Sequence, residues 1–462
     1  MTGIAKARLA LTTRAMLALS VGALIAFGAP TSASAAPLGS TAKVRAEVAD
    51  HAGDLRKFYT ARENRPLWIS PSGEVSPAVD RLLERLDSAQ FDALDHKTLK
   101  RLRTNEVRRD LDRALRGKPS DIAEADVTMS RLFADYVRAM RAAPRAQMIY
   151  ESQALAPAIP TAEAVLQAAA KAPSLETYIG QIGWMHPLYA PLRDAMGTPG
   201  FTEARRATIW DNLQRVRALP ATPAERYVLV DAAAARLTMY EDGKPVDSMK
   251  VVVGRPDAAT PQMAGFIRYA IVNPYWNVPP DLVQKTIAKG YLKGGAKWLK
   301  ANGYEVLSDY GEDAKLIDPK TVDWKAVAAG APGPYVRQKP GGPNFMGKVK
   351  YEFPNAQGIY LHDTPERALL AKDQRQLSNG CVRLEDAERL GRWLLGRSVA
   401  KIPAGKEQRL DLPTLVPVYI TYLTAAPDAK GTIAFRSDVY GRDNATRFAA
   451  REGVSAAAGS PR

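Results

Sequence analysis

The sequence predicts an α+β protein in which a helical domain precedes a mostly β domain. Apolar residues recur at helical spacing up to about residue 219, whereas short β-rich runs begin at Tyr227. A proline-containing linker over 220–226 separates the two patterns. With 462 residues, of which 46% are hydrophobic, the chain is long enough for two or three domains with packed cores.

The first 35 residues have the pattern of an export signal. Met16–Ala29 is apolar but short for a membrane span, and Ala33-Ser34-Ala35 fits an A-x-A cleavage site. Three basic residues and no acid precede the apolar run: Lys6, Arg8 and Arg14. We therefore expect residues 1–35 to be a cleaved signal peptide and the mature protein to be exported to the periplasm. The alternative is an uncleaved membrane anchor.

The charge balance is strongly basic. The formal charge is +15, of which +12 belongs to residues 36–462. Outside the cytoplasm, such an excess favours contact with an anionic polymer or membrane through long-range attraction. Nucleic acid would be the first expectation for a cytoplasmic protein of this charge, but an exported chain argues against it. The alternative is that the charge serves solubility alone.

Residues 36–219 are expected to form a helical scaffold domain. Ser76 and Pro77 are typical of a helix N-cap and first turn. Apolar groups at helical spacing follow: Val79, Leu82, Leu83 and Leu86; Met129, Leu132, Phe133 and Tyr136; Ile209, Leu213 and Val216. We expect these side chains to lie in the domain core.

Residues 226–424 are expected to form the β domain. Asp242-Gly243 is a favoured turn and predicts a hairpin that joins Arg236–Glu241 to Met249–Val253. Further strands are expected at Tyr227–Asp231, Phe266–Val272, Gly358–Leu361 and Val418–Leu423. Residues 281–343 interrupt this pattern with many Gly, Pro and Lys residues, which predicts an irregular insertion that serves as a lid or binding loop. Residues 425–462 are a C-terminal extension, and its end is expected to be disordered.

Cys381 is the only cysteine of the chain, and His362 is one of four histidines. A lone thiol in an exported protein indicates either intermolecular pairing or a reactive nucleophile. Cysteine attacks as thiolate, so a nearby imidazole must take its proton. His362 ends the apolar run Ile359–Leu361, which places it at a strand edge. The alternatives are an inert buried thiol and a core histidine. The histidines show no metal-ligand spacing, so no metal or other cofactor is expected.

The segment Ser378-Asn379-Gly380 leads into Cys381. Glycine allows the backbone to turn tightly and to approach a substrate. A helix is expected after the cysteine, with Leu384, Ala387, Leu390 and Leu394 on one face. Backbone N–H groups at such a loop-to-helix junction would hold an oxyanion and lower the thiol pKa, and Arg383 would add fixed positive charge.

These residues resemble a known family. Ser378–Arg383 is similar to the S-x-G-C-x-R signature of the YkuD-type L,D-transpeptidases, and His362-Asp363-Thr364 lies where that family has its catalytic histidine. Other family-like stretches are Val253-Gly254 with Thr260-Pro261, Asn273–Pro279, Arg337-Gln338, Gly342–Asn344 and Gly347-Lys348; Phe58–Trp68 and Asp438–Asp443 resemble the large Gram-negative, YcbB-like branch. The likeness covers most of residues 50–443 and is strongest after 226. Asn379 stands where members often carry histidine, and no peptidoglycan-binding repeat is evident in the helical region.

The resemblance implies a mostly β YkuD-like catalytic domain with a lid insertion, preceded by a helical scaffold domain. It also implies that Cys381 attacks a peptidoglycan stem tetrapeptide at the bond before its terminal D-alanine. His362 would accept the thiol proton and return it to the departing D-alanine, and an acceptor amine would then resolve the thioester. Carbapenem-type inhibitors would acylate the same thiol.

Supporting roles follow from the same resemblance. Gly380 and Cys381 would supply oxyanion donors, and Arg383 would organise the loop or bind a substrate carboxylate. Asp363 and Thr364 would orient His362, unless a backbone carbonyl does so. The remaining expected oxyanion or substrate-binding residues are Ser378, Asn379, Tyr360 and Trp276; for Tyr360 and Trp276, core packing is an equal alternative.

Three other functions remain compatible with the sequence. Water could replace the amine, which would make the protein a hydrolase of stem peptides or links. The acceptor could be an envelope protein that becomes attached to the wall. A non-catalytic wall-binding scaffold would be expected to lack the cysteine or the histidine, and both are present. The insertion 281–343 would decide between amine and water, and no pattern specifies an oligomeric state.

Overall fold

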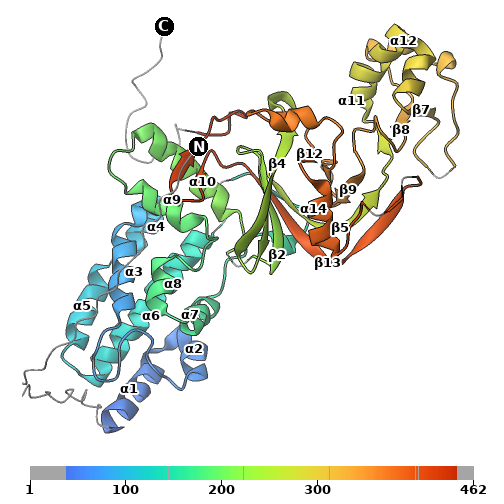
Figure 1. The fold of residues 1–462 in the computed structure, drawn as a ribbon. Helices are drawn as coiled ribbons and strands as arrows, with labels where there is room; N and C mark the ends of the chain where they lie inside the picture. Colours follow the sequence, from blue (N-terminus) through green and yellow to red (C-terminus); the bar gives the residue numbers. More distant parts are fainter. Residues whose placement is uncertain are drawn as a thin grey trace, which may run out of the picture.

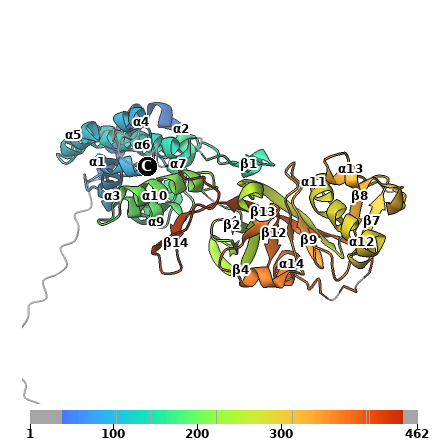
Figure 2. The same cartoon turned by 90° about the horizontal axis from the view of Figure 1, so that it is seen from above.

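The computed structural model describes residues 38–444 apart from 103, 143–145, 222, 312, 401 and 404. The expected signal peptide and the end of the C-terminal extension lie outside these residues. Three parts follow one another along the molecule: a helical domain, a β domain and the insertion (Figures 1 and 2). Within the described residues, no helix is long and apolar enough to cross a membrane.

The helical domain contains ten α-helices and a short strand within the described residues. They are α1 (Leu38–His51), α2 (Arg56–Ala61), α3 (Pro77–Asp87), α4 (His96–Arg101), α5 (Asn105–Ala114), α6 (Pro119–Arg141), β1 (Ile149–Tyr150), α7 (Ala162–Lys171), α8 (Leu175–Gly180), α9 (Tyr189–Met196) and α10 (Glu203–Arg217). Ser76 Oγ accepts a hydrogen bond from Ala78 N at 3.3 Å, which confirms the predicted cap of α3. The predicted apolar groups are all buried, so their helical spacing does mark the core.

A buried carboxylate organises the start of this domain. Asp126 on α6 is fully buried. It accepts the backbone N–H groups of Leu67, Trp68 and Ile69 at 2.6–3.1 Å. It also accepts the hydroxyl of Tyr59 at 2.7 Å. Desolvation raises the pKa of Asp126, whereas these hydrogen bonds lower it. The segment before α3 is therefore fixed to the longest helix by one side chain.

The β domain is a sheet that closes on itself. Its strands are β2 (Arg226–Asp231), β3 (Arg236–Glu241), β4 (Lys244–Gly254), β5 (Met263–Val272), β9 (Val349–Glu352), β10 (Leu361–His362), β11 (Gln376–Ser378), β12 (Val382–Leu384) and β13 (Gln408–Thr421). The order is β1-β5-β13-β2-β3-β4-β12-β10-β9, β9 pairs with β5 as well, and β11 pairs with β4. The predicted hairpin is present as β3 and β4. Helix α14 (Ala387–Leu395) packs against this domain. The buried side chains of the domain form one hydrophobic core, whose first residue in the sequence is Val228 and whose last is Tyr422.

The prediction that the insertion is irregular was wrong. It contains α12 (Ala288–Ala301), α13 (Trp324–Ala328) and the end of α11 (Pro280–Leu282). Its strands β7 (Tyr304–Leu307) and β8 (Tyr335–Gln338) form a sheet with β6 (Trp276–Asn277), which directly precedes the insertion, in the order β6-β8-β7. These elements enclose a separate core that includes Val283, Leu299, Trp324 and Val336. The core residues are widely spaced among Gly and Lys residues. The composition of the segment therefore did not predict that it folds around a core of its own.

The C-terminal extension returns to the helical domain. Strands β14 (Ala425–Pro427) and β15 (Ile433–Phe435) form a hairpin. Ala425 and Ala426 are buried in the helical core, and the ring of Phe435 lies 5.6 Å from that of Phe201. The helical core is thus built from both ends of the described chain.

Candidate active site

The expected nucleophile and base lie on adjacent strands. β10 lies between β9 and β12, and it pairs in parallel with β12 so that Leu361 faces Val382 and His362 faces Arg383. Side chains alternate between the two faces of a strand. Leu361, Val382 and Leu384 are fully buried in the barrel core. His362 and Arg383 therefore lie on the opposite face, and Cys381, two residues before Arg383, shares that face.

The Cys381 thiol is neutral in the resting site. Cys381 is partly buried, and its Sγ lies 3.6 Å from the carbonyl oxygen of Gly358, to which the thiol donates. Desolvation raises the pKa of the Cys381 thiol to about 11, although the backbone of Tyr360 and the charge of Arg383 act in the opposite direction. At neutral pH the sulfur therefore carries its proton.

His362 is neutral as well. It is buried, and its Nδ1 lies 2.6 Å from the carbonyl oxygen of Asp363. A carbonyl accepts only, so Nδ1 carries the proton and Nε2 keeps its lone pair. The pKa of His362 is lowered to about 3, chiefly by desolvation and next by the charge of Arg383, although backbone groups of Asp363 and Phe345 act in the opposite direction. The ring of His362 is thus in a form that accepts a proton at Nε2.

The helix predicted to follow Cys381 directly is absent there. Strand β12 follows instead, and α14 begins at Ala387 after the cap Asp386, whose carboxylate accepts from Arg389 N at 2.9 Å. The Cys381 thiol therefore receives no help from a helix N-terminus. The expectation of a lowered thiol pKa was wrong, because desolvation outweighs the remaining favourable contacts.

The loop before Cys381 is fixed mainly through its carbonyl groups. Arg255 N donates to the Ser378 carbonyl at 2.9 Å, and Thr260 Oγ1 donates to the Gly380 carbonyl at 2.7 Å. Ser378 Oγ donates to the Cys381 carbonyl at 2.6 Å and accepts from Gly380 N at 3.1 Å. Gly380 has φ +115°, a conformation that favours glycine. The Gly380 N–H is therefore already engaged within the loop.

Charged side chains that sequence reasoning missed lie on the face of His362. Lys350 on β9 faces His362 in the strand register, and its Nζ lies 2.7 Å from Glu352 Oε1 and 5.0 Å from the ring centre of Tyr360. Arg383 forms an ion pair with Glu366. Alternation along β9 could have placed Lys350 and Glu352 on one face, but their pairing with β10 is not readable from the sequence.

The carboxylate of Asp363 does not hold the histidine ring. It accepts from Lys348 N at 2.9 Å and from Arg367 Nη2 at 2.7 Å, whereas the backbone carbonyl of the same residue binds His362. Thr364 Oγ1 accepts from Glu366 N at 3.1 Å and so stabilises the following turn. The structure therefore favours the backbone carbonyl as the group that orients the ring.

The other expected residues lie in different surroundings. Asn379 is exposed, and its side-chain oxygen accepts from Arg255. Tyr360 precedes β10 and is half-buried, and desolvation raises its pKa to about 12. Trp276 lies on β6 at the base of the insertion, with its ring 5.3 Å from that of Phe345. A backbone group of Phe345 also affects the pKa of His362. Phe345 therefore links Trp276 to the histidine.

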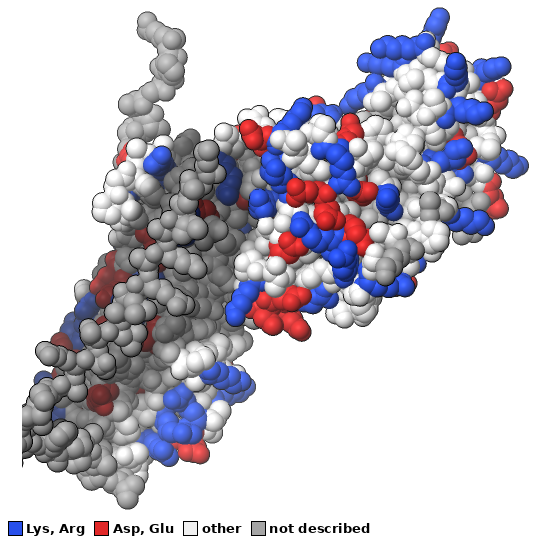
Figure 3. All heavy atoms as spheres, viewed as in Figure 1, with Lys and Arg blue, Asp and Glu red and all other residues white. Residues whose placement is uncertain are grey.

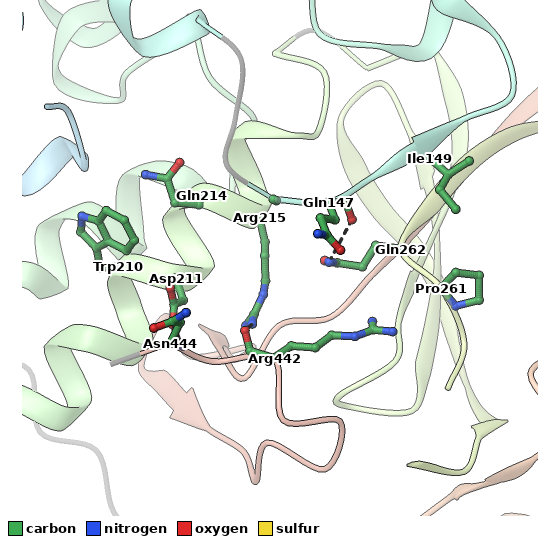
Figure 4. Close-up of a pocket in the computed structure, with 11 residues that line it drawn as sticks. Gln147, Ile149, Trp210, Asp211, Gln214, Arg215, Pro261, Gln262, Arg442 and Asn444 are labelled. Carbon is green, nitrogen blue, oxygen red and sulfur yellow. Dashed lines mark hydrogen bonds between the residues drawn. The ribbon is translucent and has the colours of Figure 1, made fainter. Parts of the chain in front are cut away.

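One cavity borders the site elements, and a second lies away from them. One of about 650 Å³ is lined in part by Lys348, Asp363, Thr364 and Arg367, so it borders the His362 strand. Another of about 370 Å³ lies between α10 and the C-terminal segment (Figure 4), and none of the expected site residues lines it. Among the described residues, no group of three or more His, Cys, Asp or Glu side chains is placed to hold a metal ion.

Comparison with known families assigns both parts of the chain. Residues 225–420 match the family described as YkuD, the L,D-transpeptidase catalytic domain. The chain carries a YkuD L,D-transpeptidase catalytic domain. Residues 53–196 match the family described as the Scaffold domain. The family resemblance and the predicted fold class, a helical scaffold before a β-rich YkuD domain, are therefore confirmed, and the combination is that of YcbB-like proteins.

Individual relatives agree with the family but are distant. The chain is 29% identical over 245 residues to the "Putative L,D-transpeptidase" of Haemophilus influenzae, an alignment over 52% of this chain and 48% of that protein. It therefore spans about half the length of this relative. A solved L,D-transpeptidase from Mycobacterium smegmatis is 13% identical, with 43% of this chain and 58% of that chain covered and a TM-score of 0.22. The catalytic domain of an Enterococcus faecium L,D-transpeptidase is 15% identical, with 43% and 98% covered and a TM-score of 0.19. These TM-scores are too low to assign a fold, and the assignment of the two domains rests on the family matches.

Proposed function

We propose that this protein is a peptidoglycan L,D-transpeptidase that forms a thioester between Cys381 and a stem tetrapeptide. The terminal D-alanine leaves, and an acceptor amine takes over the acyl group to form a cross-link. The observation that carries the proposal is the pairing of β10 with β12 within the YkuD domain. Cys381 directly precedes β12, so alternation of side chains places it on the same face as His362. A thiol and a neutral imidazole on one face are the two groups that acyl transfer through cysteine requires.

The protonation states define the first step. The Cys381 thiol and the His362 ring are both uncharged near neutral pH, because burial raises the pKa of the thiol to about 11 and lowers that of the imidazole to about 3. The sulfur therefore loses its proton to Nε2 as it attacks the carbonyl carbon. The imidazolium then gives this proton to the departing amine of D-alanine. The acceptor amine then attacks the thioester carbon and loses a proton to Nε2 of His362.

One backbone N–H is the best candidate for the oxyanion donor. The Gly380 N–H already donates to Ser378 Oγ, so it contributes to the loop rather than to a substrate. We assign the role to the Cys381 N–H, which lies next to the attacking sulfur. Removal of a donor of this kind typically costs about 100- to 1000-fold in rate. Arg383, paired with Glu366, is assigned to loop organisation and to the field around the sulfur.

The folded insertion supports the role of a lid that chooses the acceptor. An intact thioester needs water to be excluded until an amine arrives. The insertion has a core of its own, so it can act as one body, and Trp276 and Phe345 connect its base to the histidine. A hydrolase or the attachment of an envelope protein would use the same thioester with water or a protein amine as acceptor. Because both catalytic groups are retained, a non-catalytic wall-binding scaffold is disfavoured.

The expected location and partners belong to the same proposal. A cleaved signal peptide over residues 1–35 would place the enzyme in the periplasm, beside peptidoglycan and away from nucleic acid. Lysines and arginines project from the insertion on the face shown in Figure 3. Lys289, Lys293 and Lys297 are all exposed on α12, and the helix kinks at Gly295 between the second and the third of them. The positive charges of these lysines favour binding to an anionic polymer over binding to a neutral one.

The direct test is incubation with disaccharide-tetrapeptide and mass spectrometry of the products. Wild-type protein should release D-alanine and form cross-linked dimers, whereas Cys381→Ser should form neither while it unfolds at the wild-type temperature. Tripeptide without dimers would identify a hydrolase. Cross-linking by the Cys381→Ser variant would end the cysteine mechanism. A carbapenem should add its mass once, at Cys381, and an absent adduct would count against a functional nucleophile.

A second test concerns the insertion. Because it has its own core, it should be removed as a unit, with a short Gly/Ser linker in place of residues 280–333 and with β6 and β8 retained. The shortened enzyme should still form the thioester but should yield more tripeptide and fewer dimers. An unchanged dimer-to-tripeptide ratio in a folded variant would show that the insertion does not select the acceptor.

A further inference from the structure

Two of the family-like stretches have no part in the mechanism above, yet they meet beside the nucleophile loop. One contains Gly254 and Thr260, and the other is the C-terminal turn, residues 438–444. Thr260 is fully buried. Its Oγ1 donates to the carbonyl of Gly380 at 2.7 Å and accepts from Gly254 N at 2.8 Å. Its single hydroxyl therefore fastens the loop that presents Cys381 to the end of β4.

The geometry of the peptide bond gives this contact a consequence for catalysis. In a planar trans peptide, the C=O of one residue and the N–H of the next point in opposite directions. The bond from Thr260 therefore fixes the direction of the Cys381 N–H as well as that of the Gly380 carbonyl. Gly380 has φ +115° and no side chain, so nothing on the residue itself resists rotation of this peptide. The resistance comes from Thr260.

Thr260 is itself held by the C-terminal turn. The hydroxyl of Tyr440 donates to the Gly254 carbonyl at 2.6 Å, and Arg442 Nη2 donates to the Thr260 carbonyl at 3.1 Å. The ring of Tyr440 stacks on Tyr422 at 4.8 Å, and the Arg442 guanidinium lies 4.8 Å from the Tyr440 ring centre. Both ends of the segment from Gly254 to Thr260 are thus tied to one short stretch of chain.

The C-terminal turn is itself bound to helix α10 of the helical domain. Arg215 on α10 donates to the Arg442 carbonyl at 2.8 Å and pairs with Asp443 at 2.7 Å. Asn444 N donates to Asp211 on the same helix at 2.5 Å. Figure 4 shows Asp211 and Arg215 on the α10 side of the cavity, with Arg442 running along one wall and Pro261 on the far side. The helical domain therefore reaches the nucleophile loop through a continuous set of polar contacts.

We infer that Thr260 is a positioning residue that aims the Cys381 N–H at the developing oxyanion, and that the C-terminal turn transmits the support of α10 to it. The inference deepens the proposed function, since it concerns the oxyanion donor of the same nucleophile. It predicts that loss of the hydroxyl impairs reactions that pass through an oxyanion and spares those that do not.

The test compares two reactions of the same sulfur in the full-length protein. With p-nitrophenyl acetate, Sγ bonds to the carbonyl carbon, an oxyanion forms, and the C–O bond then breaks to release p-nitrophenolate and leave a thioester. With iodoacetamide, Sγ displaces iodide and no oxyanion forms. Iodoacetamide reacts with the thiolate alone, so a variant that changes only the pKa of the thiol should change the alkylation rate at least as much as the ester rate. A fall confined to the ester reaction therefore reports the oxyanion and not the ionisation of the sulfur. The rate for Cys381→Ala is subtracted in each case.

Thr260→Val should lower the rate with the ester by roughly tenfold or more, and should leave the rate with iodoacetamide within about threefold. Thr260→Ser, which keeps the hydroxyl, should restore the ratio of the two rates. An unchanged ratio in Thr260→Val, or an equal fall of both rates, would overturn the assignment. A wild-type rate with the ester no faster than that of Cys381→Ala would do so as well.

Tyr440→Phe provides a second variant if Thr260→Val fails to fold. It removes only the hydroxyl that binds Gly254. A smaller but selective loss of the ester reaction is expected, and an unchanged ratio would overturn the role of the C-terminal turn. The ester carries no stem peptide. If the wild type failed to cross-link tetrapeptides, the proposed function would fall while this ratio still decided the role of Thr260.

Discussion

The protonation state of Cys381 can be measured directly, because the protein has a single thiol. Burial raises the pKa of this thiol to about 11. A free cysteine has a pKa of about 8.5, so about a quarter of it is ionised near pH 8, against roughly one molecule in a thousand for Cys381. Iodoacetamide reacts only with the thiolate. Labelling near pH 8 should therefore be roughly two hundred times slower than that of glutathione, if the two thiolates are equally nucleophilic.

The pH dependence should distinguish alkylation from acylation. Alkylation should become about tenfold faster for each pH unit up to roughly pH 10, because the ionised fraction rises in that proportion. Acylation by a carbapenem uses His362 as base. With the pKa of His362 lowered to about 3, this base stays neutral well below neutral pH, so acylation should vary little from about pH 5 upward.

The assay is intact-mass detection of one adduct as a function of time and pH. Cys381→Ser provides the background, and protein unfolded in urea should regain the ordinary thiol profile because its burial is lost. A plateau of alkylation near neutral pH in the folded protein would refute the reasoning. It would show that a thiolate–imidazolium pair already exists in the resting enzyme, and that desolvation does not control the site.

Three further predictions concern the base, the scaffold and the surface. His362→Ala should abolish carbapenem acylation while iodoacetamide labelling stays within about tenfold of wild type, and a near-wild-type acylation rate would identify a different base. Asp126→Asn should lower the free energy of unfolding by about 2–4 kcal/mol in urea titrations, because an amide nitrogen would face buried N–H groups, and a loss below about 0.5 kcal/mol would contradict this role. Replacement of Lys289, Lys293 and Lys297 by Glu should weaken binding to purified sacculi and reduce its salt dependence, and unchanged binding in pull-downs at low ionic strength would remove the charge argument.

The helical core was predictable because its signals are local, and the same is true of the two candidate site residues as chemical groups. Buried positions of α3 and α6 repeat at helical spacing, and the lone Cys381 with His362 after an apolar run marks a nucleophile and a strand end. The segment after Cys381 was misread because Val382–Leu384 is too short for its alternation to stand out against the helix that follows.

Other features depend on contacts between distant segments. The insertion was expected to be irregular because its apolar residues are diluted by Gly and Lys, and its core becomes evident only when β7 pairs with β8. The pKa of Cys381 depends on enclosure by several strands, which no spacing in the sequence reports. Thr260 could be recognised as part of a motif, but its contact with Gly380 crosses 120 positions of the chain.

The return of the chain to the helical domain affects the order in which the protein can fold. Leu423, Ala425 and Ala426 belong to the helical core, but the ribosome makes them after the whole β domain and insertion. Part of the apolar surface of the helices therefore stays exposed until the last twentieth or so of the described chain has been made. A fragment that ends before Leu423 would lack these core residues. The helical domain therefore cannot complete its core while the chain is being made from its N-terminus up to that point.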